Sequence, residues 1–264
     1  MIDTHSHIDG SEFSEDLDLV ISRAREAGIK KVFVPAICRA DLPRLLDVCR
    51  SYPDYLYPMI GLHPENVNDE DPDEALRLME EQLQDSINDP AAPHFIAVGE
   101  VGLDLYWDDT YRELQLRVFE QQIQWAVRYN LPLMIHCRKA HNELLRLIRQ
   151  YSGSRLTGVF HCFTGSPEQA RELLSFPGFC LGIGGVLTFK NSNLPQTLHT
   201  AVPLNRIVLE TDSPYMAPVP YRGKRNEPAY VVEVAKRLAE IYKTDIDEID
   251  RITTENALRI FLKS

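Results

Sequence analysis

The chain has 264 residues, of which 44% are hydrophobic and 25% are charged, and its formal net charge is −11. These are ordinary globular values, so composition excludes a disordered chain or a fibre. No apolar run approaches the ~20 residues that span a bilayer, and the opening MIDTHSHIDG lacks the basic and apolar segments of a signal peptide. The negative charge argues against broad, non-specific nucleic-acid binding, although a local basic site remains compatible with it.

The cysteine content is typical of a protein from a reducing compartment. There are five cysteines, an odd number, and no two form a C-x-x-C pair, so neither a disulfide framework nor a zinc knuckle is expected. We therefore expect a cytoplasmic protein that enters no membrane and needs no obligate protein partner.

Short apolar runs alternate with amphipathic stretches along the whole chain. Most of these runs are continuously apolar, which is typical of parallel strands covered on both faces. The expected strands are residues 1–5, 31–36, 56–61, 95–100, 131–136, 157–161, 179–184 and 206–210. The expected helices are residues 14–27, 41–50, 72–86, 110–129, 140–151, 167–174, 194–201, 229–242 and 246–262.

Eight strands in alternation with helices predict an α/β fold of the (β/α)₈ TIM-barrel type. No Gly/Ser-rich or low-complexity segment divides the chain, so we expect one hydrolase domain over residues 1–264. The alternative is an open, doubly wound sheet. The barrel is favoured by where the ionisable side chains fall.

Side chains that can bind a metal follow nearly every expected strand. Barrel enzymes carry their chemistry at the C-terminal ends of the strands, where these groups would meet. Each histidine taken singly could be a structural core residue. Two carboxylates beside apolar strands are harder to explain without a cation, because burying an unpaired charge is costly. The candidate ligands are His5, His7, Glu100, His136, His161 and Asp212.

Imidazoles with carboxylates, and no thiolate, suit Zn²⁺, Mn²⁺, Fe²⁺ or Co²⁺, and Mg²⁺ less well. Six ligands are too many for one tetrahedral ion and suit two ions that share a carboxylate. In the expected scheme Asp212 also orients the attacking water and accepts its proton as general base. We expect His5, His7 and Asp212 on one ion, His136 and His161 on the other, and Glu100 between them.

Nine segments, five of which carry the six candidate ligands, follow one another in a recognisable order: MIDTHSHID, IGLHPE, AVGEVGLDLYW, LPLMIHCRKA, GVFHCFTGS, LGIGGVLTF, IVLETDSPYMAP, YRGKRNEP and the closing TTENALRIF. Together they resemble the TatD family of metal-dependent deoxyribonucleases, within the amidohydrolase-like barrels. The resemblance implies a barrel with two divalent ions (Mg²⁺, Mn²⁺ or Zn²⁺) that hydrolyses DNA phosphodiesters, often as a 3′-to-5′ exonuclease. It implies the same six metal residues and places His63 against a substrate phosphate.

Basic and aromatic residues share the loops that follow the expected strands. Arginine forks match phosphate oxygens, and unpaired bases stack on aromatic rings such as Tyr106 and Trp107. The alternative for each residue singly is an ordinary solvated or loop-packing side chain. The expected phosphate contacts are Arg138, Arg222, Lys224 and Arg225.

Acidic residues near the expected site argue against tight binding of a long DNA strand. Asp104, Asp108 and Asp109 follow the fourth expected strand and would repel a long polyanion. We therefore expect weak, salt-dependent binding of DNA as a single strand or a frayed end.

The leading hypothesis is a metal-dependent deoxyribonuclease. One alternative is a dinuclear-metal hydrolase of a small ester, lactone or amide, because the fold alone does not choose among such reactions. A second alternative is a metal-stabilised scaffold without turnover.

Overall fold

The computed structural model describes residues 1–69, 71–89, 94–107 and 109–262, and the chain forms two compact units. The first unit comprises Met1–Val34 with His161–Ser264, and the second comprises Pro35–Phe160. Within the described ranges, no helix is both long and apolar enough to cross a membrane. Asp108, one of the acids expected to repel DNA, lies outside the described residues.

The first unit is built from two pairs of parallel strands. Ile2 lies opposite Lys31 in the first pair, and Leu181 lies opposite Ile207 in the second. Its strands are β1 (Ile2–Asp3), β2 (Lys31–Pro35, whose last residue begins the second unit), β7 (Phe179–Ile183) and β8 (Ile207–Leu209). Its helices are α1 (Leu17–Glu26), α6 (Pro167–Leu174), α7 (Leu194–Ala201), α8 (Val231–Tyr242) and α9 (Ile246–Phe261).

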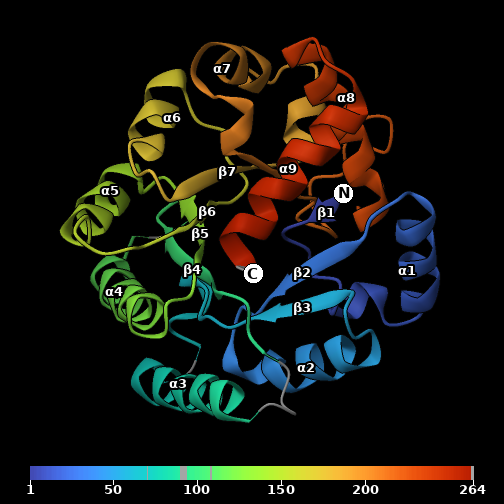
Figure 1. Cartoon of the computed structure of the whole chain (residues 1–264). Coiled ribbons are helices and arrows are strands. Elements are labelled where there is room, and N and C mark those ends of the chain that lie inside the picture. Colours follow the sequence, from blue (N-terminus) through green and yellow to red (C-terminus); the bar gives the residue numbers. More distant parts are fainter. Residues whose placement is uncertain (70, 90–93, 108, 263–264) are drawn as a thin grey trace. The chain divides into compact units, whose positions relative to one another are not determined.

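The second unit repeats the alternation of strand and helix. β4 pairs in parallel with β5, and β5 pairs in parallel with β6. Figure 1 shows the helices of this unit along one side of its strands. The strands are β3 (Leu56–Met59), β4 (Val98–Asp104), β5 (Leu133–Arg138) and β6 (Gly158–Phe160). The helices are α2 (Leu42–Ser51), α3 (Pro72–Asn88), α4 (Arg112–Tyr129) and α5 (His141–Gln150).

Helix starts follow from local capping chemistry. The Ser166 hydroxyl accepts a hydrogen bond from the Gln169 amide, and the Gln169 side chain accepts one from the Ser166 amide, so α6 opens with a capping box followed by Pro167. The carboxylate of Asp245 accepts from the Glu248 amide at 2.8 Å and caps α9. These signals explain why the expected and observed starts coincide there.

The expected first helix is wrong at its start. The expected helix covers residues 14–27, but α1 begins at Leu17. The Ser14 hydroxyl instead donates to the Ser11 carbonyl at 2.8 Å, at the end of a short 3₁₀ turn, Ser11–Phe13. Gly28, with φ of 84°, follows the end of α1, where a left-handed residue suits glycine.

The expected fourth strand is also wrong in its bounds. It was expected over residues 95–100, whereas β4 runs over Val98–Asp104. Glu100 therefore lies within the strand, and Asp104 ends it. The pattern was misleading because the GLD segment after Glu100 looks like a loop, yet all seven residues of β4 are buried.

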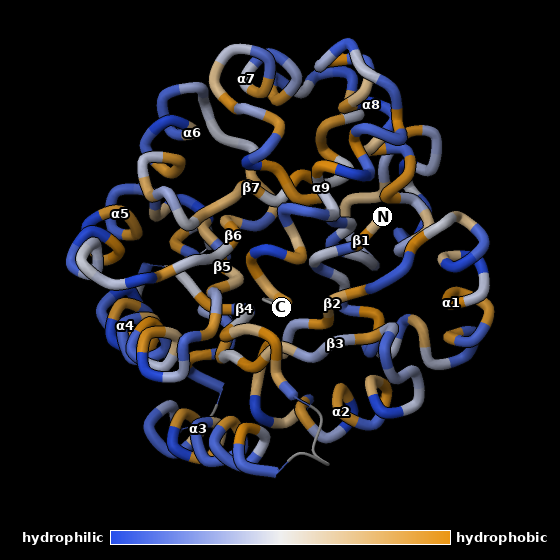
Figure 2. Tube along the Cα trace, in the orientation of Figure 1, coloured by the Kyte–Doolittle hydropathy of each residue, from blue (hydrophilic) through white to orange (hydrophobic). Residues whose placement is uncertain are grey.

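Within the described residues, each of the eight expected strands and nine expected helices has a counterpart. The strands are among the most hydrophobic parts of the trace (Figure 2). In the first unit, for example, the rings of Phe33 and Phe261 pack with centroids 5.1 Å apart. Burial of such apolar surface supplies most of the folding free energy.

Candidate metal centre

His5, His7 and Asp212 converge in the first unit. The Nε2 atoms of the two histidines lie 3.2 Å apart, and each lies 3.7 Å from Oδ1 of Asp212. Two ligand atoms at about 2.1 Å from one divalent ion are themselves roughly 3.0–3.4 Å apart. The two histidine nitrogens are therefore spaced as ligands of one cation would be, and their distances to Oδ1 of Asp212 are slightly longer than this range.

Backbone pairing between the ends of β1 and β8 creates this convergence. Ser6 forms a parallel bridge with Ser213, and their hydroxyl oxygens lie 2.6 Å apart. The His7 amide donates to the Ser213 carbonyl at 2.8 Å, and the Asp212 amide donates to the His5 carbonyl at 2.9 Å. Asp212 itself has a φ of 56°, a left-handed conformation that non-glycine residues adopt under local strain.

His161 joins the same group from the end of β6. Its ring stacks on that of His5, with centroids 4.0 Å apart and planes 7° from parallel. One ligand atom from each of His5, His161 and Asp212 lies within 4.8 Å of the others. The first unit thus brings four of the six predicted ligands together.

The second unit gathers His63, Glu100 and His136. Oε1 of Glu100 lies 3.1 Å from Nδ1 of His136 and 3.3 Å from Nε2 of His63. An irregular register in the β4–β5 pairing between Val98 and Val101 accompanies this placement, and the Glu100 amide donates to the Ala36 carbonyl. Glu100 is 3% exposed, so its carboxylate needs these partners.

The charge environment of this second group favours a cation. Burial by itself lowers the pKa of His136, but hydrogen bonds to Asp104 and Glu100 outweigh burial and raise the pKa to about 10. Burial also lowers the pKa of His63, and Glu100 offsets this only in part. Two carboxylates around one imidazole favour positive charge at this point, which a divalent ion would supply.

Asp104 is a site residue that the sequence reasoning treated only as a repelling loop acid. Its Oδ2 lies 2.8 Å from Nε2 of His136, and its Oδ1 accepts a hydrogen bond from the Tyr106 amide at 2.9 Å. Because β4 continues to Asp104, this carboxylate stands directly beside the end of β5. Extension of the apolar pattern past Glu100 was the signal that would have found it.

Glu210 was also missed, although the same burial argument applies to it as to Asp212. It is fully buried, and burial raises its pKa to about 8, partly offset by His161. Oε1 accepts a hydrogen bond from the Cys162 amide and lies 3.8 Å from Nδ1 of His161. Oε2 has no hydrogen-bond partner in the described part of the chain. We infer that Glu210 orients His161, as carboxylates behind metal-binding histidines commonly do.

The buried carboxylate of Asp3 binds the backbone at the ends of β1 and β8. It accepts hydrogen bonds from the Thr211 hydroxyl at 2.6 Å, the Thr211 amide at 2.9 Å and the His5 amide at 3.3 Å. Burial is the main reason that the pKa of Asp3 rises to about 7. Asp3 thereby links Thr211, the residue before Asp212, to the backbone of His5.

The packing around Glu210 gives a direct test. A Cβ atom on Gly182 would lie 2.0 Å from Oε2 of Glu210, so Gly182→Ala must displace that carboxylate. We expect roughly 10–100-fold weaker metal binding, the usual effect of disturbing an outer partner of a ligand, measured by titration of the chelator-treated protein. Gly184→Ala is the matched control, since its nearest contact would be an ordinary 3.4 Å. Equal metal affinities for the two variants would contradict the role of Glu210.

The expected phosphate contacts differ in what surrounds them. Arg222 and Lys224 are exposed, and the Arg222 guanidinium lies 3.8 Å from the centre of the Phe189 ring. Arg138 is exposed at the end of β5. Arg225 instead forms a two-pronged ion pair with Asp16 at 2.7 and 2.8 Å, which lowers the pKa of Asp16. Arg225 thus anchors its loop to the start of α1.

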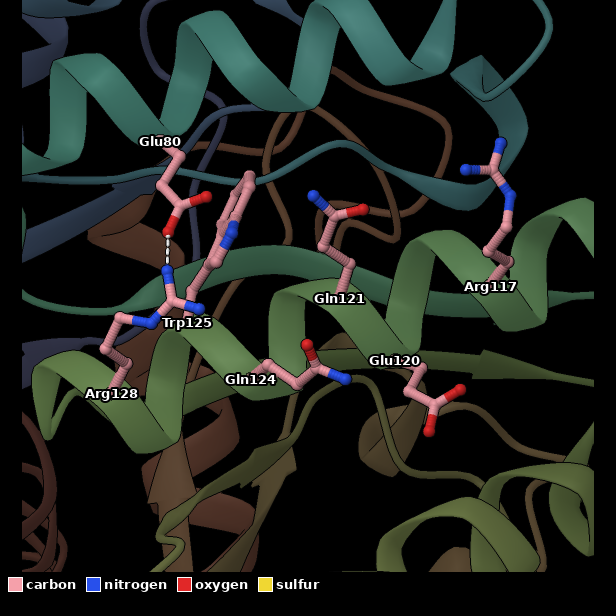
Figure 3. Close-up of a pocket in the computed structure, with 7 residues that line it drawn as sticks. All are labelled: Glu80, Arg117, Glu120, Gln121, Gln124, Trp125 and Arg128. Carbon is pink, nitrogen blue, oxygen red and sulfur yellow. Dashed lines mark hydrogen bonds and ion pairs between the residues drawn. The ribbon is translucent and has the colours of Figure 1, made fainter.

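A cavity of about 230 Å³ lies beside α3 and α4 (Figure 3). Its walls carry opposite charges, and the ion pair between Arg128 and Glu80 closes one side. The remaining lining residues are Arg117, Glu120, Gln121, Gln124 and Trp125. None of the predicted site residues lines it.

Known proteins are similar to this chain over nearly its whole length. The family model described as TatD related DNase matches residues 2–262. The uncharacterized metal-dependent hydrolase YabD of Bacillus subtilis is 37% identical over 261 residues, which cover 99% of this chain and 98% of YabD. The 3′-5′ ssDNA/RNA exonuclease TatD of Pectobacterium parmentieri is 31% identical over 266 residues, with 99% of each chain covered.

Solved structures agree. The crystal structure of YjjV, a TatD homologue from Escherichia coli, matches with a TM-score of 0.89 and 33% identity, covering 100% of this chain and 98% of that one. A TatD-family hydrolase from Entamoeba histolytica, at 22% identity, has the same fold with a TM-score of 0.86. The predicted α/β fold of the TIM-barrel type is therefore confirmed.

Fold and strand-end groups define a metal-dependent hydrolase. The chain belongs to the TatD family.

Proposed function

We propose that this hydrolase cleaves DNA phosphodiester bonds, acting as a deoxyribonuclease from the 3′ end of single-stranded or frayed DNA. The observation that carries the proposal is that each unit contains an imidazole–carboxylate group and an exposed arginine whose guanidinium lies over an aromatic ring. Arginine forks on such rings suit phosphate oxygens. The name of the Pectobacterium relative supports the same substrate class.

The donor set fits divalent cations. His5, His7, His161 and Asp212 would hold one ion, and Glu100, His136 and His63 offer a second group. Nitrogen and carboxylate oxygen without thiolate fit Mn²⁺, Zn²⁺ or, less well, Mg²⁺. When bound, such ions supply Lewis acidity at the phosphorus and a lower pKa for a nearby water. The predicted division, with Glu100 shared and His136 and His161 on one ion, stays a prediction.

The chain's own residues have distinct roles in this proposal. Asp212 accepts the proton of the attacking water as general base, held by its amide contact to the His5 carbonyl. Glu100 fixes His136 and His63. His63 faces a phosphate of the substrate. Asp104 sets which nitrogen of His136 faces Glu100 by binding the other one. Arg138, Arg222 and Lys224 contact phosphates of the strand, and Arg225 positions its loop.

The proposal also places the enzyme in the cytoplasm. All five cysteines lie in the described part of the chain, and no disulfide joins any two of them there, as expected in a reducing compartment.

Metal-dependent cleavage of defined substrates tests the proposal. Protein purified without chelator is first analysed for bound metals. It is then assayed with Mg²⁺, Mn²⁺ and Zn²⁺ on end-labelled single-stranded DNA and on duplexes with frayed or flush ends. The same ions are tested with chromogenic esters, lactones, amides and phosphodiesters. The proposal expects stepwise shortening from the 3′ end, abolished by chelator. Turnover of an ester, lactone or amide with no DNA cleavage would overturn it.

A hydrolase of small substrates is the second candidate, because a net charge of −11 opposes a long polyanion. The exposed basic pair separates the two. Replacing Arg222 and Lys224 with alanine should weaken DNA binding. The slope of the logarithm of the binding constant against the logarithm of the salt concentration should become shallower by about 0.7 for each lost phosphate contact. Hydrolysis of a small neutral ester should be unchanged.

Binding constants across a salt series measure this effect. Lys236→Ala with Arg237→Ala on α8 is the control pair, since both side chains are exposed and pair only with neighbouring glutamates among the contacts described. An unchanged salt slope in the Arg222, Lys224 variant would remove these residues from the DNA contact.

A further inference from the structure

Trp107 carries an unusual amount of open apolar surface. It is 74% exposed, the highest value among the large hydrophobic side chains of the described chain. It lies three residues beyond Asp104, which ends β4. The exposed ring of Trp107 lacks the stabilisation that burial would give it, and its flat face is open for stacking with a ligand.

The neighbours of Trp107 hold this ring in place without covering it. Tyr106 meets it edge to face, with ring centroids 4.7 Å apart and planes 84° from parallel. The Arg138 guanidinium lies 3.7 Å from the centre of the Tyr106 ring and 5.4 Å from that of Trp107. One face of Tyr106 is thus occupied by a cation. The ring of Trp107 is the larger open surface of the two.

The same segment is tied to the candidate metal centre through Asp104. One carboxylate oxygen of Asp104 accepts from the Tyr106 amide, and the other contacts His136. The Leu105 amide donates to the Arg138 carbonyl at 2.9 Å, continuing the β4–β5 pairing. A group seated on Trp107 would therefore lie at a defined position relative to His136 and Glu100.

We propose that Trp107 stacks the base of one unpaired nucleotide while Arg138 contacts an adjacent phosphate. The inference rests on the proposed function and deepens it, because it specifies how an unpaired end is selected. Every base offers a flat face, so stacking is tolerant of sequence, but a base paired within a duplex is covered on both faces by its neighbours. The fork of Arg138, held flat on Tyr106, keeps its outward N–H groups for phosphate oxygens.

The intrinsic fluorescence of the chain provides a binding test that does not depend on catalysis. The sequence has two tryptophans, and the other, Trp125, is only 1% exposed, so a stacked base quenches Trp107 selectively. The full chain, kept in chelator to prevent cleavage, is titrated with a short dT oligonucleotide and with an abasic oligonucleotide of equal length and charge. We expect quenching with the first only, and binding of the abasic strand that is about 5–100-fold weaker.

Variants assign the effect to individual residues, with binding followed by the anisotropy of labelled oligonucleotides. Trp107→Ala should lose the preference for the base-containing strand, and Trp107→Phe should keep most of it. Arg138→Ala should weaken the binding of the dT oligonucleotide and of the abasic oligonucleotide to the same extent. Ile87→Ala on α3 serves as the control, because Ile87 is also an exposed apolar residue, at 49% exposure. It should leave the binding of both oligonucleotides unchanged. Thermal unfolding of each variant checks that it remains folded.

The outcomes separate this inference from the proposed function. Equal binding of both strands by the wild-type protein, or full preference retained in Trp107→Ala, overturns the stacking role even if DNA is cleaved. Base-dependent quenching with no cleavage of any DNA supports the stacking role and overturns the proposed deoxyribonuclease activity.

Discussion

Glu100→Ala is expected to lower hydrolysis by at least about a thousand-fold, equivalent to roughly 4 kcal/mol of transition-state stabilisation. Glu100 contacts both His63 and His136 with one carboxylate oxygen, and it is buried within β4. Removing it leaves His136 with Asp104 as its carboxylate partner and removes one oxygen from the second ligand group. The loss should therefore appear in kcat together with metal content.

Three measurements check this expectation: kcat and KM on the substrate that the panel identifies, metal content by elemental analysis, and thermal unfolding. Glu113→Ala on α4 is the matched control, because its side chain is 83% exposed and pairs with Arg112 at the surface. It should retain the wild-type rate. A Glu100→Ala protein that turns over at the wild-type rate would show that the assignment of the site is wrong.

Gly102→Ala should be the most destabilising single methyl addition near the site. A Cβ there would lie 2.0 Å from the His136 carbonyl oxygen, and Gly102 has a φ of 141°, which a side chain rarely adopts. The obstacle is backbone, which cannot rotate away as a flexible side chain can. Separating β4 from β5 would also move His136, so we expect a loss of about 4 kcal/mol or more in the free energy of unfolding.

Chemical denaturation gives this free energy, and the yield of folded protein gives a lower bound if the variant does not fold. Gly153→Ala is the control in the same unit, since a Cβ there meets nothing within 4 Å. It should change the free energy of unfolding by less than about 0.5 kcal/mol. Near-equal stabilities for the two variants would mean that β4 and β5 do not pair closely at Gly102.

Local pattern alone located most of the secondary structure. Apolar runs predicted each strand, and the expected starts of α3 and α6 at Pro72 and Pro167 agree with the structure. The clearest errors, at β4 and α1, lie where a short buried segment or a serine has a second local option. Ser14 can cap a helix or donate to the preceding turn, and only the surrounding packing selects between them.

The residue types of the site were also predictable, but their partners were not. A histidine or carboxylate that follows an apolar strand is visible in sequence, as with His136 and Asp212. That Asp104 contacts His136 depends on the β4–β5 register, and that Glu210 fits beside His161 depends on Gly182. Such contacts join segments far apart in the chain, and no local pattern specifies them.

By itself, the sequence determined the order of strands and helices, the family and the chemical types available for binding metal, because periodicity and residue identity are local properties. Tertiary structure decided which groups actually meet. In the folded chain Asp104 contacts His136, Arg225 pairs with Asp16, which lies 209 residues away in the sequence, and the side chain of Trp107 is exposed to solvent. The physical reason is that burial, register and charge pairing depend on distances that exist only after the chain has folded.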